Sequence, residues 1–118
     1  MVSKYKELED RTFQFAQNIK FFCRDLPKNT SNFEYYKQLI RSSGSVAANY
    51  IEANEALGDK DFLMRVRISK KEAKESILWL KLVDCNIEKE AIRKNLIDEA
   101  PQLIRIFAAI ITKRSKIL

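Results

Sequence analysis

The 118-residue sequence contains no histidine, two glycines and two prolines. Histidine is the commonest general acid or base and the commonest metal-binding side chain, so its absence argues against most hydrolytic and metal-dependent chemistry. The Glu-x-x-His pairs of di-iron helical bundles are excluded outright. Because glycine and proline are scarce, turn chemistry is limited, which favours a few long helices over a many-stranded sheet.

Several other signals are missing. Cys23 and Cys85 lie far apart and lack the spacing of zinc ligands, so we expect free thiols in a reducing cytoplasm and no metal. No apolar run approaches the roughly 20 residues that span a bilayer, and the first residues lack the apolar segment of a secretion signal. We therefore expect a cytoplasmic protein that does not associate with membranes.

Recognisable catalytic and cofactor motifs are also missing. The sequence contains neither of the glycine-rich phosphate-binding patterns, so nothing suggests a nucleotide cofactor. The serines Ser42, Ser43 and Ser45 have no evident base to activate a nucleophile. We expect a protein that is not an enzyme, with no cofactor and no evident small-molecule substrate.

The residues that are present describe one basic globular domain over residues 1–118. Apolar residues make up 46% of the chain and charged residues 32%, which is an ordinary composition for a folded domain. The formal net charge is +6, with a calculated pI near 9.4. This charge permits binding to nucleic acid without requiring it.

Apolar residues recur at three- and four-residue steps in four stretches and form one inward stripe in each. The stripes include Tyr5, Phe15 and Ile19 in the first stretch, Leu39 and Leu57 in the second, Val66 in the third and Phe107 in the last. They predict helices over residues 4–25, about 32–57, about 60–85 and about 98–114. Ser31 or Asn32 is the expected N-cap of the second helix, and Asp59 or Asp61 that of the third. Gly58 stands where a left-handed residue is expected after the second helix.

Residues 86–100 are the hardest to place. They suggest a loop with a helical turn over residues 88–93. Pro101 favours a final helix that starts near Asp98, or else a kinked helix, because proline is tolerated best in a first turn. Four amphipathic helices with short connections predict an all-α, antiparallel up-down-up-down four-helix bundle.

Some apolar side chains fall outside the main stripes. Phe13 and Phe21 lie off the first helix's stripe, either as isolated exposed aromatics or as part of a second contact surface. Met64, Ile68 and Trp79 form a second seam on the third helix. A helix that is apolar over so wide an arc must touch more than one neighbour, so we predict these five residues at a subunit interface.

The second helix carries a polar strip beside its apolar stripe. Its predicted members are Arg41, Ser42, Ser45, Asn49 and Glu52. The strip is either a solvated face or a partly buried hydrogen-bonding network at a helix or subunit contact, since buried polar groups need partners.

The third helix also carries a row of cations: Arg67, Lys70, Lys71, Lys74 and Lys81. Four of them lie within about 80° on a helical wheel, and Lys70 borders them. The row is either a solvated face or a surface that follows a phosphate backbone. No aromatic residue alternates with the lysines, so any recognition would concern backbone and shape more than bases.

Two segments carry a family resemblance. Residues 38–56, QLIRSSGSVAANYIEANEA, and residues 61–83, DFLMRVRISKKEAKESILWLKLV, resemble the bacterial four-helix-bundle proteins encoded in intervening sequences of large-subunit ribosomal RNA genes. The chain is also similar to accessory proteins of diversity-generating retroelements. The resemblance implies a homopentamer with a central channel and possible contact with RNA or DNA. It transfers no catalytic residue.

Two functional hypotheses follow. The first is a non-enzymatic oligomeric protein that binds RNA or DNA through the basic surface of the third helix. The alternative is a protein-interaction scaffold or accessory subunit that binds no nucleic acid.

Overall fold

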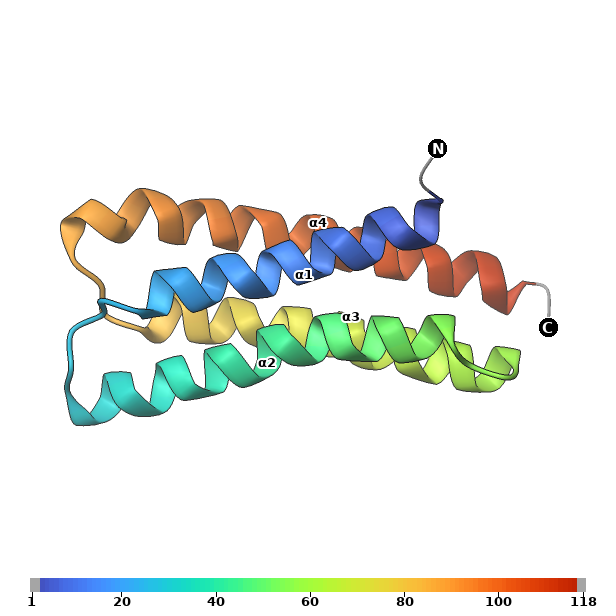
Figure 1. The fold of residues 1–118 in the computed structure, drawn as a ribbon, viewed down its shortest axis with the longest axis horizontal. Helices are drawn as coiled ribbons and strands as arrows, with labels where there is room; N and C mark the ends of the chain where they lie inside the picture. The colour runs from blue at the N-terminus through green and yellow to red at the C-terminus, as the bar shows by residue number, and fades with distance from the viewer. Residues whose placement is uncertain (1–2, 117–118) are drawn as a thin grey trace.

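The structure is a computed structural model that describes residues 3–116. It contains four helices: α1 (Lys4–Cys23), α2 (Thr30–Asn54), α3 (Asp59–Leu82) and α4 (Glu90–Ser115), with a short 3₁₀ turn, η1 (Ile87–Lys89), before α4. The helices run side by side in alternating directions along a bundle 47 Å long (Figure 1). Within residues 3–116 there is no strand. The predicted all-α four-helix bundle is confirmed.

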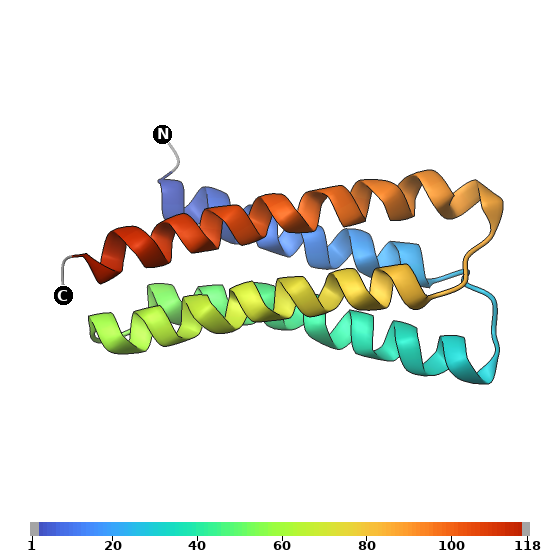
Figure 2. The ribbon, with the colours of Figure 1, turned by 180° about the vertical axis from the view of Figure 1, so that it is seen from behind.

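Each helix packs on the next along the chain, and α4 closes the bundle against α1. The α2–α3 pair is the most closely packed and the α1–α4 pair the least. The view from behind shows α3 and α4 crossing in front of the other two helices (Figure 2). The helices α1 and α3 are therefore diagonal partners, whose outer faces point to opposite sides of the molecule.

The core consists of the predicted apolar stripes. Phe15 and Ile19 of α1, Leu39 of α2, Val66 of α3 and Phe107 of α4 are almost completely inaccessible to solvent. Burying each such side chain contributes about 1.5–3 kcal/mol relative to leaving it in water. At one end of the bundle the predicted stripes are not fully buried. Tyr5 and Leu57 are exposed there, although both were expected to point inward.

The start of α2 differs from the prediction. Its N-cap is Asn29, whose side-chain oxygen accepts a hydrogen bond of 2.9 Å from the Asn32 backbone N–H. Asn32 itself is buried and bridges two connections, donating to the carbonyl oxygens of Pro27 and Asp84 and accepting from the Asp84 N–H. The predicted cap at Ser31 or Asn32 is wrong because Asn32 serves a long-range contact instead.

The α2–α3 connection also differs. The helix α2 ends at Asn54, and Gly58 has an extended φ of −155°. Gly58 is the N-cap of α3, so the predicted left-handed role is wrong. Asp59 and Asp61 lie in the first turn of α3, where the positive end of the helix dipole favours their charge. At its other end α3 stops at Leu82, three residues before the predicted end.

The helix α4 begins at Glu90, eight residues earlier than predicted, and continues through Pro101. The predicted start near Asp98 is wrong. The Arg93 side chain fixes the early turns, because its guanidinium donates to the Leu80 and Val83 carbonyl oxygens at the end of α3 and pairs with Glu90. Among the described residues, no helix is apolar over a stretch long enough to cross a bilayer.

Candidate nucleic-acid interface

The cations of α3 form an open row along its outer surface. Arg67, Lys71, Lys74 and Lys81 are exposed, and Lys70 is half-buried. Within residues 3–116 none of the five takes part in an ion pair. We call these five residues the α3 basic stripe.

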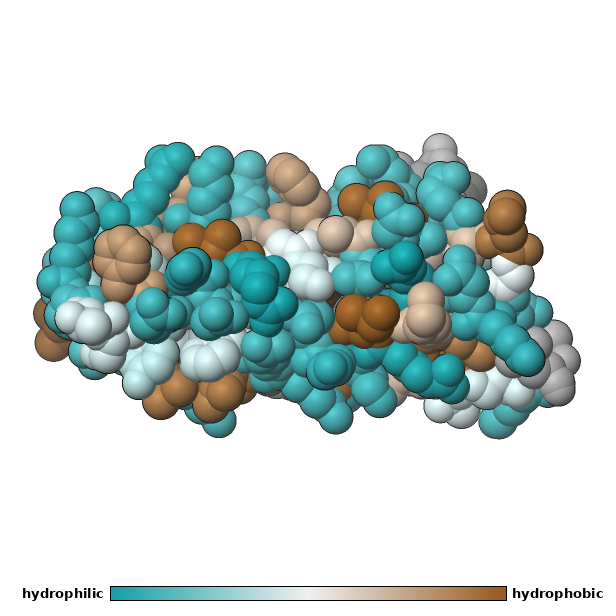
Figure 3. Space-filling view, turned by 90° about the horizontal axis from the view of Figure 1, so that it is seen from below, coloured by the Kyte–Doolittle hydropathy of each residue, from teal (hydrophilic) through white to brown (hydrophobic). Residues whose placement is uncertain are grey.

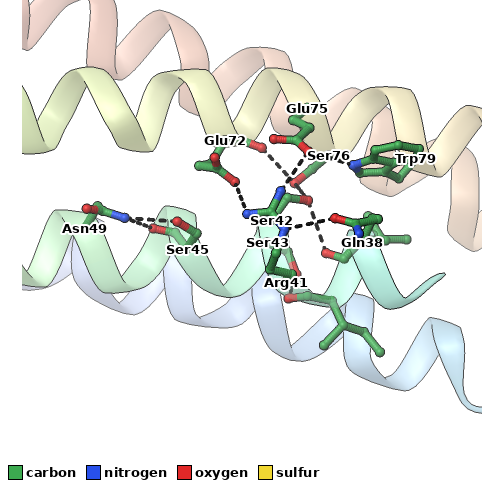
Figure 4. Close-up of polar contacts among 12 residues, drawn as sticks. Gln38, Arg41, Ser42, Ser43, Ser45, Asn49, Glu72, Glu75, Ser76 and Trp79 are labelled. Atoms are coloured by element: carbon green, nitrogen blue, oxygen red, sulfur yellow. Dashed lines mark hydrogen bonds and ion pairs between the residues drawn. The ribbon is translucent and has the colours of Figure 1, made fainter. Parts of the chain in front are cut away.

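The acidic residues of α3 point elsewhere. Glu72 and Glu75 face α2, where the Arg41 guanidinium binds both carboxylates at 3.1 Å and 2.7 Å (Figure 4). The Glu75 carboxylate also accepts a 3.2 Å hydrogen bond from the Trp79 indole N–H. Lys71, four residues from Glu75 in the same helix, does not form an ion pair with it. The carboxylates closest in sequence to the stripe are therefore already occupied by a cation from another helix.

The pKa shifts of Glu75 and Arg41 are consistent with this pairing. Partial desolvation raises the pKa of Glu75, but hydrogen bonds from Arg41 and Trp79 outweigh it and leave that pKa below its ordinary value. The hydrogen bond to Glu75 raises the pKa of Arg41. Lys71 contributes a weaker attraction to Glu75, consistent with proximity without contact.

A polar seam joins α2 to α3 beside this charged cluster. The buried hydroxyls of Ser42 and Ser76 lie 2.8 Å apart, and Ser69 donates to the Val46 carbonyl at 2.9 Å. These short side chains allow the two helices to approach closely at the waist of the bundle. The seam therefore explains why α2 and α3 are the most tightly packed pair.

Four of the five predicted polar-strip residues have partners. Arg41 and Ser42 contact α3 as described above. Asn49 donates to Ser45 in the same helix, and its oxygen accepts a 3.1 Å hydrogen bond from Arg65 of α3. Glu52 is exposed, and its side chain makes no hydrogen bond to the described residues.

Sequence reasoning missed the α3 half of this network: Glu72, Glu75, Ser76 and Arg65. The repeat of Ser69 and Ser76 seven residues apart was a usable signal, since it places two hydroxyls on one face of a helix. No comparable pattern in the sequence indicated that both glutamates would pair with Arg41.

Comparisons with known proteins add the family. A family model described as 23S rRNA-intervening sequence protein matches residues 6–109. The chain belongs to this family. The chain is also similar to a solved protein from Bacteroides thetaiotaomicron, described as a protein of unknown function from the S23 ribosomal protein family. The two are 28% identical, with a TM-score of 0.77, over 93% of this chain and 99% of the other. No curated protein matches it.

In this member of the 23S rRNA-intervening sequence family, the five predicted interface residues lie on two sides. Phe13 and Phe21 of α1 are 58% and 45% exposed, and Met64 of α3 is 46% exposed. Ile68 and Trp79 of α3 are half-buried. On the face seen in Figure 3, hydrophobic residues form separate patches between polar ones.

Trp79 has aromatic and hydrogen-bond partners within its own chain. Its ring stacks on Tyr35 of α2 with centroids 6.1 Å apart, and its N–H is bound by Glu75. Phe21 in turn is accompanied by the Arg24 guanidinium, 4.9 Å from the ring centre. Because α1 and α3 are diagonal, the two sets cannot belong to one flat patch.

Proposed function

We propose that this protein is a non-enzymatic, oligomeric binding protein that contacts the phosphate backbone of RNA or DNA through the α3 basic stripe. The observation that carries the proposal is the division of charge on α3. Arg41 pairs with the two glutamates on one side, whereas the five cations on the other side form no ion pair within residues 3–116.

The dimensions suit a phosphate backbone. Arg67 and Lys81 are 14 residues apart, which corresponds to about 21 Å along a helix. Phosphates of one DNA strand follow at about 3.4 Å along the helix axis, so the stripe can lie against several of them. Without aromatic residues among the lysines, base stacking contributes little, and we expect weak sequence preference.

Oligomerisation is part of the proposal because the exposed apolar residues lie on opposite sides of the bundle. Phe13 and Phe21 lie on the outer face of α1, and Met64 on that of α3. A contact between two different patches is heterologous, and a heterologous contact closes into a ring when its rotation allows. A ring repeats the α3 basic stripe in every subunit, which raises a weak affinity through avidity.

The test is RNA affinity measured across salt concentration. The variant Lys71→Glu/Lys74→Glu should bind at least about tenfold more weakly and should reduce the slope of log K against log salt by about 1.4–1.8, because each of the two lost phosphate contacts removes about 0.7–0.9. The matched control Lys37→Glu/Lys94→Glu changes the charge equally at exposed sites of α2 and α4. Equal losses in both variants, or a flat salt response in the wild type, would contradict the proposal.

The alternative function is a protein-interaction scaffold. Several large hydrophobic side chains outside the core, including Phe13, Phe33 and Ile51, are about half exposed. This hypothesis expects RNA to leave the assembly unchanged and the double-glutamate variant to behave like the wild type. The same salt titration therefore separates the two functions.

A further inference from the structure

A groove opens at the end of the bundle where α1 begins and α4 ends. Its volume is about 660 Å³, and a neighbouring hollow of about 510 Å³ lies beside it. The two hollows share Ser3, Tyr5, Phe62 and Arg114, so they form one continuous depression. It exists because α1 and α4 pack less closely than any other adjacent pair of helices.

The larger hollow is lined mainly by hydrocarbon and aromatic side chains: Leu8, Tyr50, Phe62, Ile106 and Ile110. Leu8, Tyr50 and Phe62 belong to the core, so the groove reaches the interior of the bundle. Covering such a surface removes apolar area from water and favours an apolar occupant.

Cations predominate around this apolar surface. Lys4, Arg11, Lys113 and Arg114 line the larger hollow, against the single acid Glu7. Arg11 is held by Glu99 in a bidentate pair at 2.9 Å, but within residues 3–116 Lys4 and Lys113 form no ion pair. The charge therefore complements an anion attached to an apolar group.

Arg114 marks where the anionic group belongs, because it lines both hollows. Its guanidinium lies over the Phe62 ring, 4.1 Å from the ring centre, and makes only a loose 3.7 Å contact with Asp59. The smaller hollow also contains the acids Glu9 and Asp59 and the cation Lys6. A second negative charge in that hollow is therefore disfavoured.

An unsatisfied polar group provides an independent indication. The side-chain nitrogen and oxygen of Asn54, which lines the smaller hollow, are buried without a hydrogen-bond partner. Burial raises the pKa of the neighbouring Tyr50 phenol, and Asn54 offsets part of that rise, so the two side chains are close without forming a hydrogen bond of normal geometry. Buried polar groups are rarely left unpaired. Because a carboxylate only accepts hydrogen bonds, one bound beside Arg114 would supply a partner for the Asn54 side-chain nitrogen and none for its oxygen.

We propose that this groove binds a free long-chain carboxylate of the fatty-acid class. The hydrocarbon chain occupies the hollow lined by Leu8, Ile106 and Ile110, and the carboxylate lies at the junction beside Arg114 and Asn54. This site is independent of the α3 basic stripe, so it stands or falls separately from the nucleic-acid proposal.

The test is a titration with dodecanoate, kept below its micelle concentration, followed by the methyl NMR signals of the isoleucines. We expect saturable binding that shifts the Ile106 and Ile110 signals and leaves Ile92, at the far end of α4, unchanged. Dodecyltrimethylammonium, which has the same chain and the opposite charge, should bind at least about tenfold more weakly. Acetate should not bind measurably.

Two variants and two matched controls separate the site from general adsorption. Ile110→Trp fills the apolar hollow and Arg114→Gln removes the anion partner; each should weaken dodecanoate binding at least about tenfold. Ile92→Trp and Lys94→Gln make the same kinds of change at exposed positions near the start of α4 and should bind like the wild type.

Three results would overturn the proposal: equal affinity for the cationic and anionic chains, binding only above the micelle concentration, or equal affinity in all four variants. If Ile110→Trp does not fold, Arg114→Gln and the wild-type NMR shifts still decide. Vesicles of anionic phosphatidylglycerol test the other source of an anion attached to an apolar group, which is a membrane surface. If they bind equally to wild type and Arg114→Gln, while dodecanoate shifts no groove signal, a membrane surface is attracted to the net charge and the groove is empty.

Discussion

At the scale of single residues, Arg41 has the largest effect on how charge is distributed. It extends from α2 and binds Glu72 and Glu75, and Glu72 is 8% exposed. A carboxylate at that depth is costly without a partner, whereas an exposed ion pair contributes little. The Arg41 side chain is itself about half exposed, which moderates the total effect.

We expect Arg41→Met to lower the free energy of unfolding by about 1–2 kcal/mol, because Glu72 loses its cation while remaining buried. Urea denaturation followed by circular dichroism measures the change. Arg105→Met removes an exposed arginine of α4 that forms no ion pair with the described residues, and it should stay within about 0.5 kcal/mol of the wild type. A similar loss in both variants would mean that Arg41 acts through general charge.

Arg41→Met should also change how the free energy of unfolding depends on acid pH. The pKa of Glu75 is lowered in the folded state, so its contribution to stability is present above the ordinary value of 4.5 and is lost as the pH falls through the folded value. The wild type should therefore lose more stability than Arg41→Met between about pH 5 and pH 3. Parallel curves for the two proteins would contradict this assignment.

The two thiols should differ in reactivity. Cys23 is 5% exposed, and its burial raises the pKa of the thiol to about 12. Cys85 is more accessible, although burial and the nearby Glu90 also raise its pKa. Since the thiolate is the reactive form, a disulfide reagent at pH 8 should label Cys85 first and Cys23 only after unfolding. Fast labelling of the folded Cys85→Ser variant would contradict the buried position of Cys23.

At the scale of elements, α2 is notable for a glycine at its centre. Gly44 is exposed and helical, and a Cβ atom placed on it would have no neighbour within 4 Å. Glycine inside a helix costs about 0.5–1 kcal/mol relative to alanine, and none of the residues 3–116 packs closely enough to require it here.

Gly44→Ala should therefore stabilise the subunit by about 0.5–1 kcal/mol, measured as a higher denaturation midpoint at low protein concentration. If the midpoint falls and the solution mass falls with it, another chain packs over this position. Ala48→Gly, at an exposed position one turn later, provides the opposite change as a control and should destabilise by a similar amount.

At the scale of the whole molecule, assembly is the main prediction. Five chains of 13.8 kDa correspond to about 69 kDa, which is the mass that the family resemblance implies. Sedimentation should give a multiple of the chain mass, and Met64→Lys or Phe13→Asp should each lower it, because they place charge on opposite sides of one heterologous contact.

Leu57→Lys is the control for this experiment, since Leu57 is fully exposed in the α2–α3 connection. It should leave the mass unchanged. A single species of 13.8 kDa in the wild type would contradict the oligomer and would leave the α3 basic stripe to act without avidity.

Periodicity predicted most of the fold because burial repeats along a helix with a fixed step. The predicted stripes contain Phe15, Leu39, Val66 and Phe107, and all four are core residues. Helix ends were less predictable. Asn32 and Arg93 decide where α2 and α4 begin through hydrogen bonds to residues ten or more positions away, and no local pattern signals such contacts.

The amino-acid sequence determined the four helices, their inward faces and the surplus of positive charge, because each of these depends on composition and on spacing within one element. The fold decided which charged side chains are paired within the chain and which face solvent. Lys71 and Lys74 precede Glu75 by four residues and one residue in the same helix, yet Arg41, 34 residues away from Glu75, pairs with both glutamates. The packing of α2 on α3 presents a guanidinium, with several fixed donors, to two partly buried carboxylates at once, and the lysines of α3 are left facing solvent.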